Sequence, residues 1–461
     1  MVPPFFLIMK IVKLIIISII QLIPIGGYSY DFGIDGIYYN ILSLRDLTVE
    51  VTNNGWYNAY GSSFGTTINI PETVEYMGKQ LRVIAIGDEA FMCVNNTERN
   101  GTVSIPSSIR RIGKRAFNSF GISKIKLPEG LEIIDENAFW DTKLTSIDIP
   151  ATVNKIGDAA FSAIKELSKI HVDEDNPYYD SRENSNTIIE TETNTLIAAC
   201  NNSVFPSTIK HFGNYVFFNF SLTSIVIPES IETIGDYCFS FCTSLTSIQV
   251  PQRVSYIGKY AFLGCEKLSS FECSPNVEYI SEGVFEGCYQ LTTIKLPSEL
   301  VSIGDRAFNY CIKLEDIYLP SSLKTIGENS FYGCQSLREI NIPVQVQNIG
   351  NSAFYECSNL GKIRVFITNP INIEKNCFPD LCYMLSTLYV PNGCKEVYNN
   401  APIWKNFSDI QEFDPTGIRN VAKSYRKVRI YNTSGRLIDK PQKGLYIIQK
   451  EDRSSNKVVI K

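Results

Sequence analysis

Cysteine is the residue whose number and spacing in this chain most suggest chemistry, because 13 cysteines stand among 461 residues. In an exported chain, cysteines could form disulfides. Side chains placed once per turn of a repeat would lie parallel, however, rather than converge as a disulfide requires. Cysteine is also a common small buried residue. We therefore expect core thiols, with disulfides or metal ligation as the alternative. Six of the cysteines recur at one constant interval: Cys242, Cys265, Cys288, Cys311, Cys334 and Cys357.

Two short cysteine pairs and two histidines are the other candidates for a metal or catalytic site. Cys238–Cys242 has a C-x3-C spacing and Cys377–Cys382 a C-x4-C spacing, but neither has the matching second pair with histidine that a zinc site needs. Histidine is the usual general base, and His171 and His211 are the only two. No GxGxxG, P-loop, HExxH or GxSxG sequence is present. The sequence predicts no enzyme, no metal and no cofactor.

The acidic run at residues 173–176, Asp-Glu-Asp-Asn, is a candidate calcium site. Its oxygen ligands, with Asp180 nearby, suit Ca²⁺. The run lacks the spaced ligands and the glycine of an EF-hand loop, so a solvated turn is the favoured interpretation. Tyr178 and Tyr179 on the same loop could contact a partner or pack back onto the body of the protein.

These residues must be positioned by a repeat, because the cysteines belong to a wider pattern. An apolar residue stands nine and usually eleven places after each repeated phenylalanine, followed usually by a proline and then by an Ile-Gly pair. The units after Phe117 and Phe139 are one residue shorter and lack the cysteine. A fixed period of about 23 residues is typical of a solenoid. Five phenylalanines follow this period, each three places before a cysteine and six before a leucine: Phe239, Phe262, Phe285, Phe308 and Phe331.

The alternation at plus nine and plus eleven predicts a strand with one buried face. Successive strands would pair in parallel at about 4.7–4.9 Å, so that about 13 coils would make a rod of roughly 60–70 Å. The proline would end each strand, because it cannot donate to the next ladder bond. The Asp/Glu-x-Ala-Phe segment after Ile-Gly predicts a short helical turn on the opposite side, with phenylalanine pointing into a core of Phe, Leu, Ile and Cys.

Other segments flank or interrupt this array. Lys10 and Lys13 precede an apolar run and then small residues, which predicts a signal peptide over residues 1–29, with Met9 as an alternative start. A membrane anchor is the alternative, although the run is short for a span. Trp404 and Phe407 are suited to closing the open end of the core. We expect a strand-rich cap over 30–85, the solenoid over 86–413 with an irregular coil and a loop or small hairpin at 171–216, and a small all-β module over 414–461.

The repeated phrases, such as IGDRAFNYCIKLEDIYLP at residues 303–320, resemble the BspA-like bacterial leucine-rich repeats from Ile86 to about Phe413. The resemblance implies a β-rich leucine-rich-repeat solenoid of parallel strands and short helical turns, with the N-terminal β cap and the small C-terminal all-β module at its ends. Through IYNTSGRLI and KGLYII, residues 428–461 resemble terminal modules of secreted Bacteroidota proteins, some of which act as sorting or anchoring signals. Members of the repeat family are non-catalytic surface proteins, often linked to adhesion to host proteins or to other cells.

Side chains at plus eight and plus ten would form an exposed face along the strands, where solenoids bind extended partners. Mixed charge on this face, and a net charge of −5 without a basic stripe, disfavour nucleic acid as a partner. Plain solubility is the alternative role for these residues. The candidate partner face consists of Lys124, Lys126, Asp148, Gln249, Lys295, Asp316, Tyr318, Glu339, Asn341, Lys362 and Arg364.

These features predict an exported, non-enzymatic repeat protein, secreted or at the cell surface, without a membrane span after signal cleavage. Its expected partners are host or bacterial surface proteins, which makes an adhesin the leading hypothesis. The alternative is a glycan-binding component of a surface nutrient-uptake system. That alternative requires exposed Tyr and Trp side chains to cluster into a stacking platform.

Overall fold

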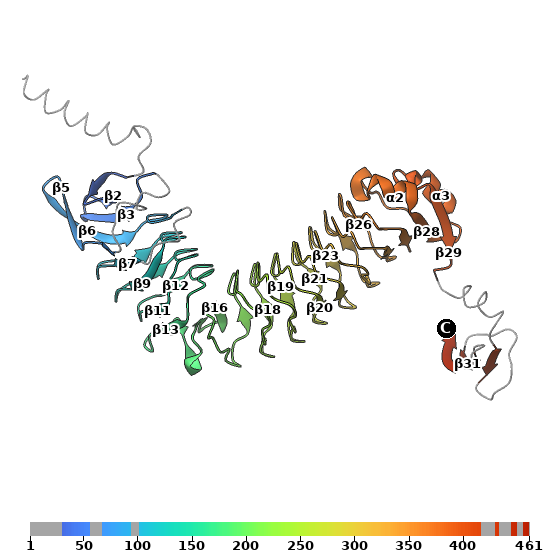
Figure 1. Cartoon of the computed structure of the whole chain (residues 1–461), viewed down its shortest axis with the longest axis horizontal. Helices are drawn as coiled ribbons and strands as arrows, with labels where there is room; N and C mark the ends of the chain where they lie inside the picture. The colour runs from blue at the N-terminus through green and yellow to red at the C-terminus, as the bar shows by residue number, and fades with distance from the viewer. Residues whose placement is uncertain are drawn as a thin grey trace, which may run out of the picture.

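Each repeat forms one coil of a parallel β-solenoid of about 14 turns with very little helix, as predicted (Figure 1). The computed structural model describes residues 30–55, 67–93 and 101–415, and the backbone of three further strands. Within the array the coils stack along a curved path (Figure 1).

The first set of parallel strands contains the alternating apolar residues, as expected. Each residue pairs with the equivalent residue of the next coil, as Ile340 does with Ile363. Buried and exposed residues alternate along them, so that one face of each strand points into the core. The set comprises β4 (Thr67–Asn69), β7 (Gly101–Ser104), β9 (Ile122–Lys126), β11 (Ser146–Ile149), β13 (Lys169–Val172), β20 (Ser270–Glu272), β22 (Thr293–Lys295), β25 (Glu339–Ile342), β27 (Lys362–Val365), β28 (Thr387–Pro391) and β29 (Asp409–Phe413).

A second set of parallel strands was not predicted. The isoleucine of most Ile-Gly pairs ends a strand of two residues, which pairs with its copies in neighbouring coils, as Ile303 does with Ile326. A corner of the coil therefore also carries backbone hydrogen bonds between coils. The set comprises β8 (Arg111–Ile112), β10 (Ile133–Ile134), β12 (Lys155–Ile156), β17 (His211–Phe212), β18 (Thr233–Ile234), β19 (Tyr256–Ile257), β21 (Tyr279–Ile280), β23 (Ser302–Ile303), β24 (Thr325–Ile326) and β26 (Asn348–Ile349).

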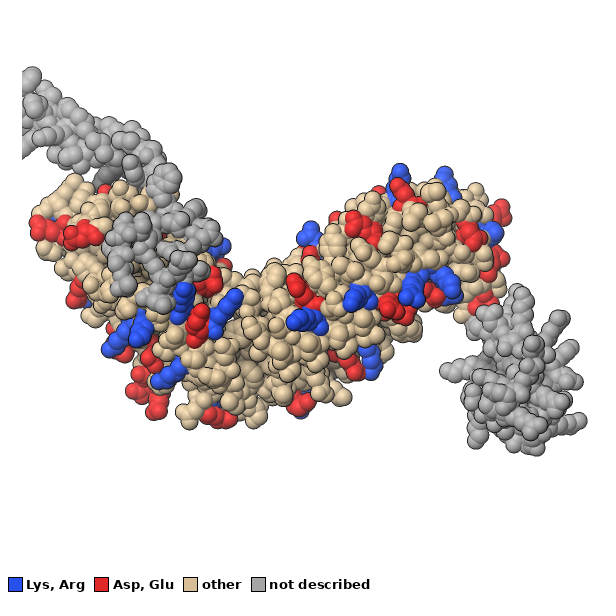
Figure 2. All heavy atoms as spheres, in the orientation of Figure 1, with Lys and Arg blue, Asp and Glu red and all other residues tan. Residues whose placement is uncertain are grey.

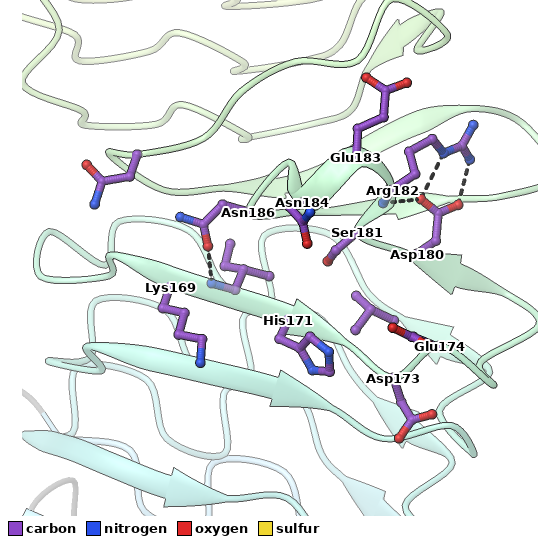
Figure 3. Close-up of a pocket in the computed structure, with 13 residues that line it drawn as sticks. Lys169, His171, Asp173, Glu174, Asp180, Ser181, Arg182, Glu183, Asn184 and Asn186 are labelled. Atoms are coloured by element: carbon purple, nitrogen blue, oxygen red, sulfur yellow. Dashed lines mark hydrogen bonds and ion pairs between the residues drawn. The ribbon is translucent and has the colours of Figure 1, made fainter.

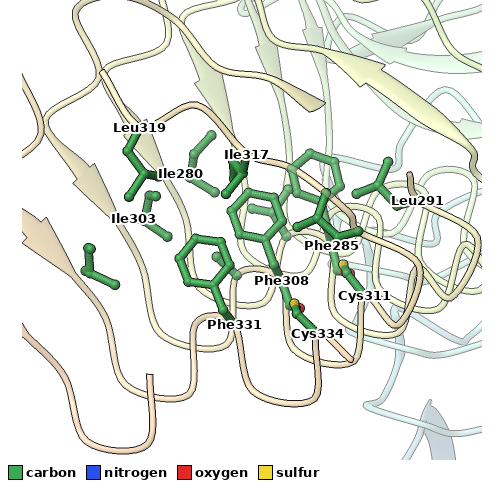
Figure 4. Packing of buried hydrophobic residues seen from close by; sticks show 14 of the residues in the cluster. Ile280, Phe285, Leu291, Ile303, Phe308, Cys311, Ile317, Leu319, Phe331 and Cys334 are labelled. Carbon is green, nitrogen blue, oxygen red and sulfur yellow. The ribbon is translucent and has the colours of Figure 1, made fainter. Parts of the chain in front are cut away.

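Phenylalanine from each coil forms a ladder inside the solenoid (Figure 4). From Phe217 to Phe378, neighbouring ring centroids lie 4.9–5.8 Å apart and the ring planes are within 12° of parallel. Offset parallel stacking is a favourable arrangement of aromatic rings. Isoleucine and leucine side chains such as Ile303 and Leu319 lie beside the rings (Figure 4). The predicted inward position of phenylalanine is confirmed.

The repeated cysteines lie in the same core, as predicted. All 13 cysteines are free and buried. The Sγ of Cys265 donates to the carbonyl of Phe239 in the preceding coil at 3.1 Å, and the other five repeated cysteines make the equivalent contact at 3.1–3.3 Å. Burial raises the pKa of these thiols, to about 12 for Cys242. They therefore stay protonated at neutral pH and are poor nucleophiles.

The segment around each core phenylalanine is a chain of β-turns, so the predicted short helical turn is wrong. The residues two places before and after Phe262 have left-handed backbone conformations, with φ of 55° at Tyr260 and 67° at Gly264. Such φ values interrupt an α-helix. The Phe262 N–H donates to the carbonyl of Val284 in the next coil at 2.9 Å, and other coils repeat this bond. The turns therefore form a third ladder of hydrogen bonds between coils, which we call the turn ladder.

The irregular coil at residues 171–216 contains three antiparallel strands that cross the solenoid. They are β14 (Tyr179–Asp180), β15 (Thr187–Glu190) and β16 (Thr195–Ala199), with η1 (Arg182–Asn184) between the first two. We call these three strands the plate. Ile188 and Ala198 of the plate belong to the core of the N-terminal coils, whereas Ile189 and Leu196 belong to the core of the C-terminal coils. Successive residues of β15 thus face opposite cores, as a strand buried on both faces requires. Of the two alternatives expected here, a loop or a small hairpin, the structure has the hairpin, formed by β15 and β16.

Two of the repeated contacts stop at the plate. The rings of Phe139 and Phe161 stack at 5.3 Å, and the next run of stacked rings starts at Phe217. The turn ladder likewise ends in the coil of Phe161 and resumes at Tyr215. Side-chain hydrogen bonds span the interruption, and the Ser162 Oγ donates to the Tyr215 carbonyl at 2.9 Å. The solenoid is therefore two stacked halves joined through a two-sided plate.

Atypical, strand-rich elements close the N-terminal end of the array. β3 pairs in parallel with β6, which pairs with β8 of the first regular coil. The cap consists of β1 (Phe32–Ile34), β2 (Ile37–Ser43), β3 (Thr48–Thr52), β5 (Thr73–Tyr76) and β6 (Lys79–Ile86). The predicted signal peptide lies outside the described residues.

At the C-terminal end, Trp404 and Phe407 are buried against Phe378, with ring centroids 6.1 and 5.6 Å away. They close the core as predicted. Short helices lie around them: η2 (Lys375–Cys377), α2 (Asp380–Leu385), α3 (Lys395–Asn400) and η3 (Trp404–Asn406). In the predicted C-terminal module, β30 (Arg429–Asn432), β31 (Gly444–Gln449) and β32 (Ser455–Ile460) form an antiparallel sheet.

Replacing one ladder phenylalanine should destabilise the array strongly. Phe285 is fully buried between Phe262 and Phe308, so Phe285→Ala should lower the free energy of unfolding by about 3–5 kcal/mol in urea denaturation. Tyr279→Ala is the matched control, because that ring is exposed and its loss should cost about 0.5 kcal/mol or less. Equal effects of the two substitutions would contradict the phenylalanine ladder.

Alkaline pH should destabilise the protein through its core thiols. An unfolded thiol ionises near pH 8.5, whereas burial raises the pKa in the fold. The thiols' stabilising contribution is therefore present below about pH 8.5 and is lost as the pH rises toward their folded pKa values. Melting temperature measured from pH 7.5 to 10.5 should fall, and the triple variant C265A/C288A/C311A should show a shallower fall. An unchanged slope in the variant would contradict this role.

Candidate functional site

Eight of the eleven candidates lie on strands of the first set, and Gln249, Asp316 and Tyr318 occupy the equivalent places in coils without a named strand there. We call the solvent side of this row of strands and equivalent segments the strand face. The register places Glu339 opposite Lys362, and Asn341 opposite Arg364. The plate separates Lys124, Lys126 and Asp148, which lie on β9 and β11, from the remaining candidates. Glu339, Asn341 and Arg364 are half-buried, whereas the other eight are exposed: Lys124, Lys126, Asp148, Gln249, Lys295, Asp316, Tyr318 and Lys362.

Ion pairs between neighbouring coils neutralise part of this charge. Lys295 pairs with Glu272, and Arg364 pairs with Glu339. The Arg364 guanidinium also lies over the Tyr389 ring, 5.2 Å from its centroid, a favourable cation–π contact. Arg364 is thus held between an acidic and an aromatic side chain on three adjacent strands, β25, β27 and β28.

The sequence-based candidate set missed Glu272, Tyr389 and His171, which lie on the same face. Glu272 lies opposite Lys295, and Tyr389 lies opposite Arg364. His171 lies opposite Asp148, and its Nδ1 is 3.6 Å from the aspartate oxygen. Counting one repeat length from a chosen candidate would have found Glu272 and His171. Tyr389 lies farther than one repeat length after Arg364, because extra residues enter the last coils.

Acidic and basic side chains alternate over the molecule without a large area of one sign in the face shown (Figure 2). On the strand face, Lys124, Lys126 and Lys362 have no ion pair with any described residue. These free cations are spread over coils at both ends of the array, and acidic residues lie between them. Such a surface suits a partner of mixed charge rather than a polyanion.

The turn ladder carries a second row of aromatic residues outside the core. Tyr215 stacks on Tyr237 at 4.8 Å, and Tyr237 on Tyr260 at 5.0 Å, with nearly parallel planes. The Tyr260 hydroxyl donates to Glu282; burial and this bond raise the pKa of Tyr260, and the bond holds the pKa of Glu282 below its usual value. A Cβ at Gly283, where φ is 59°, would lie 2.2 Å from the Tyr260 ring. The ring faces therefore cover neighbouring rings and the next coil.

The acidic run at residues 173–176 forms a turn anchored by Asn176. The buried Asn176 amide donates to the carbonyls of Pro150 and Val153 at 2.8 and 3.0 Å. Asp180 pairs instead with Arg182 at 2.6 Å. No group of three or more His, Cys, Asp or Glu side chains within the described ranges could hold a metal ion.

The tyrosines and histidines near this turn have structural partners. Tyr179 packs back and is buried, and its hydroxyl accepts a hydrogen bond from the Ile156 N–H at 2.8 Å, whereas Tyr178 is exposed. His211 lies on β17, with Nδ1 2.8 Å from the Thr233 hydroxyl.

A cleft of about 570 Å³ opens between β13 and the plate (Figure 3). Lys169 and His171 project from β13 on one side, and Arg182 and Glu183 lie on the other (Figure 3). The Asn186 side chain reaches across to the Ile170 backbone. The sequence pattern did not indicate this cleft, because it arises where the plate replaces a regular coil. No helix in the described ranges is long and apolar enough to cross a membrane.

Comparisons with known proteins identify the family. Six copies of the BspA type leucine rich repeat region match residues 84–197, 197–311 and 279–410. No curated protein matches the chain. Similar solved structures include a leucine-rich repeat protein from Bacteroides ovatus (26% identity, 73% of this chain and 94% of that chain, TM-score 0.36). Another is a leucine rich cell surface protein from Faecalibacterium prausnitzii (25%, 69% and 94%, TM-score 0.38).

A leucine-rich repeat protein from Eubacterium ventriosum covers 76% of this chain and 97% of its own, at 19% identity and a TM-score of 0.51. That likeness concerns the fold. The matched region spans most of the solenoid and well over half of the chain, and it places this protein among repeat scaffolds for protein interaction. The chain belongs to the BspA-type leucine-rich repeat family.

Proposed function

We propose that this chain is an exported, non-enzymatic scaffold that binds surface proteins through its strand face, as an adhesin. Three observations support the proposal. The sequence of residues 1–29 has the pattern of a signal peptide. The matched family consists of repeat proteins and gives no sign of an enzyme. Exposed side chains of both charges follow the strand face on both sides of the plate, as an extended protein partner requires.

The arrangement around Arg364 is the observation on which the proposal depends. Arg364 and Tyr389 are half-buried, in contact, and surrounded by polar residues of neighbouring strands. Arginine and tyrosine that are already held in place lose little conformational freedom on binding and are frequent hot spots of protein interfaces. Lys362, two residues before Arg364 on β27, adds a cation that has no ion pair within the described residues. This part of the strand face is therefore suited to a partner protein with acidic and aromatic groups.

The glycan hypothesis is less well supported. It expects exposed aromatic rings that present their faces to a sugar. The row formed by Tyr215, Tyr237 and Tyr260 instead has its ring faces stacked on one another. On the strand face, Tyr318 is exposed, but Tyr389 is covered by Arg364. A protein partner is the better fit, and residues 414–461 remain a proposed sorting or anchoring module.

Binding assays on the full chain test this function. The immobilised protein should capture one or more purified host matrix or bacterial surface proteins, and Arg364→Ala should weaken that binding by about tenfold, equal to about 1.4 kcal/mol. Arg253→Ala is the matched control, because Arg253 is an exposed arginine in a loop outside the strand face, and it should change affinity less than about twofold. Binding to a glycan array without binding to any protein would contradict the proposal. Equal effects of the two substitutions would contradict the assignment to the strand face.

A further inference from the structure

β13 is a strand with one open edge. It pairs in parallel with β11, where Ile147 lies opposite Ile170 and Asp148 opposite His171. In a parallel ladder, alternate residues direct their N–H and C=O groups to opposite sides of the strand. Asp173 donates to the carbonyl of Ile149, so Ile170 and Val172 direct their backbone groups away from β11. Both residues line the cleft beside the plate.

The same position is paired in two other coils of the array. Val172 corresponds to Ile149 in β11 and to Ile342 in β25. The carbonyl of Ile149 accepts the N–H of Asp173 at 2.9 Å, and the carbonyl of Ile342 accepts the N–H of Phe366 at 2.9 Å, each from the next coil. On this side of Ile170 and Val172 no strand within the described ranges pairs with β13, because β13 pairs with β11 alone.

One side chain already occupies part of this edge in the manner of a peptide group. The Asn186 amide nitrogen donates to the Ser168 carbonyl at 2.9 Å, and its oxygen accepts from the Ile170 N–H at 2.6 Å. These two backbone groups flank Lys169. One residue of a parallel partner strand would bond to the same pair of groups. The edge therefore accepts an amide in strand geometry, and the next such position, between the Ile170 carbonyl and the Val172 N–H, faces the cleft.

We propose that this edge binds an extended peptide segment of a partner protein by addition of a strand parallel to β13. The incoming residue opposite His171 would donate to the Ile170 carbonyl and accept from the Val172 N–H. Recognition would rest on backbone hydrogen bonds, so the site is separate from the side chains of the strand face around Arg364.

The side chains of β13 set the sequence that the site prefers. Lys169 and His171 are exposed on the strand face, and Lys169 has no ion pair within the described residues. A carboxylate opposite His171 would lie diagonal to Lys169, and opposite charges on neighbouring strands are favourable. β11 already places Asp148 opposite His171 on the other side. The ligand is therefore an extended segment with an acidic residue between two apolar residues.

The strand β11 supplies a direct probe. A capped, fluorescent peptide with the sequence Thr-Ser-Ile-Asp-Ile-Pro, that of residues 145–150, has the register with β13 that the proposal requires. Its binding to the full chain can be measured by fluorescence anisotropy. Val172→Pro removes the N–H on the open side and no bond to β11, and proline is tolerated at such an edge. This variant should bind the peptide about tenfold more weakly or worse, while its melting temperature reports that it is folded.

Two further variants separate strand addition from non-specific adsorption. Asn186→Gly removes the competing side-chain amide, so this variant should bind the peptide more tightly. Glycine tolerates the φ of 59° at this position. Lys169→Glu should weaken binding of this peptide and strengthen binding of its Asp-to-Lys analogue. Equal binding by the native chain and Val172→Pro would overturn the proposal, as would no binding by both the native chain and Asn186→Gly. If Lys169→Glu still binds the Asp-containing peptide more tightly than its Lys analogue, to the same degree as the native chain, the assignment of the acidic residue is wrong.

Discussion

Backbone hydrogen bonding between neighbouring coils is the constraint on which the rest of this structure depends. Each coil has to present N–H and C=O groups to the coils on both sides at the same places, because buried backbone groups without a partner are costly. The fixed repeat length follows, since a residue can pair with its copy only if both occupy the same place in the coil. The regular stacking of Phe262 on Phe285 and the contact of Cys265 with Phe239 are consequences of the same alignment.

The plate shows what the chain does where this constraint is not met. Side chains take over the hydrogen bonds that a regular coil would make: the Tyr179 hydroxyl accepts from Ile156, and the Asn186 amide bonds to both sides of Lys169. The apolar residues of β15 alternate between two cores, so that each half of the solenoid is closed by the same strands. These side-chain hydrogen bonds do not extend to Val172, so the edge of β13 beside the cleft has no strand partner there. The proposed peptide site and the irregular coil are linked by geometry, because an added strand needs an edge that no strand already pairs with.

Much of the fold follows from the sequence because its signals are periodic. The spacing of phenylalanine, leucine and cysteine predicted the buried ladder, and alternation predicted the strands and the exposed positions such as Lys295 and Lys362. The turn ladder was not predicted, because Asp/Glu-x-Ala-Phe is equally compatible with a helical turn. The sign of φ at Tyr260 is set by the neighbouring coil rather than by the residue itself, and only Gly264 and its glycine copies give a local hint. The cleft could not be predicted, because it depends on how residues far apart in the chain, such as His171 and Asn186, meet at the plate.

One proposed binding site lies on the strand face, and the other lies at the edge of β13 that no strand pairs with. Amide hydrogen exchange measured residue by residue on the full chain tests this account most directly. Val172 and Ile342 are equivalent residues of β13 and β25, buried to a similar extent, and they differ in whether the next coil pairs with them. Because no strand pairs with Val172 on its outer side, its amide should exchange orders of magnitude faster than the Ile342 amide. Equal protection of the two amides would contradict it.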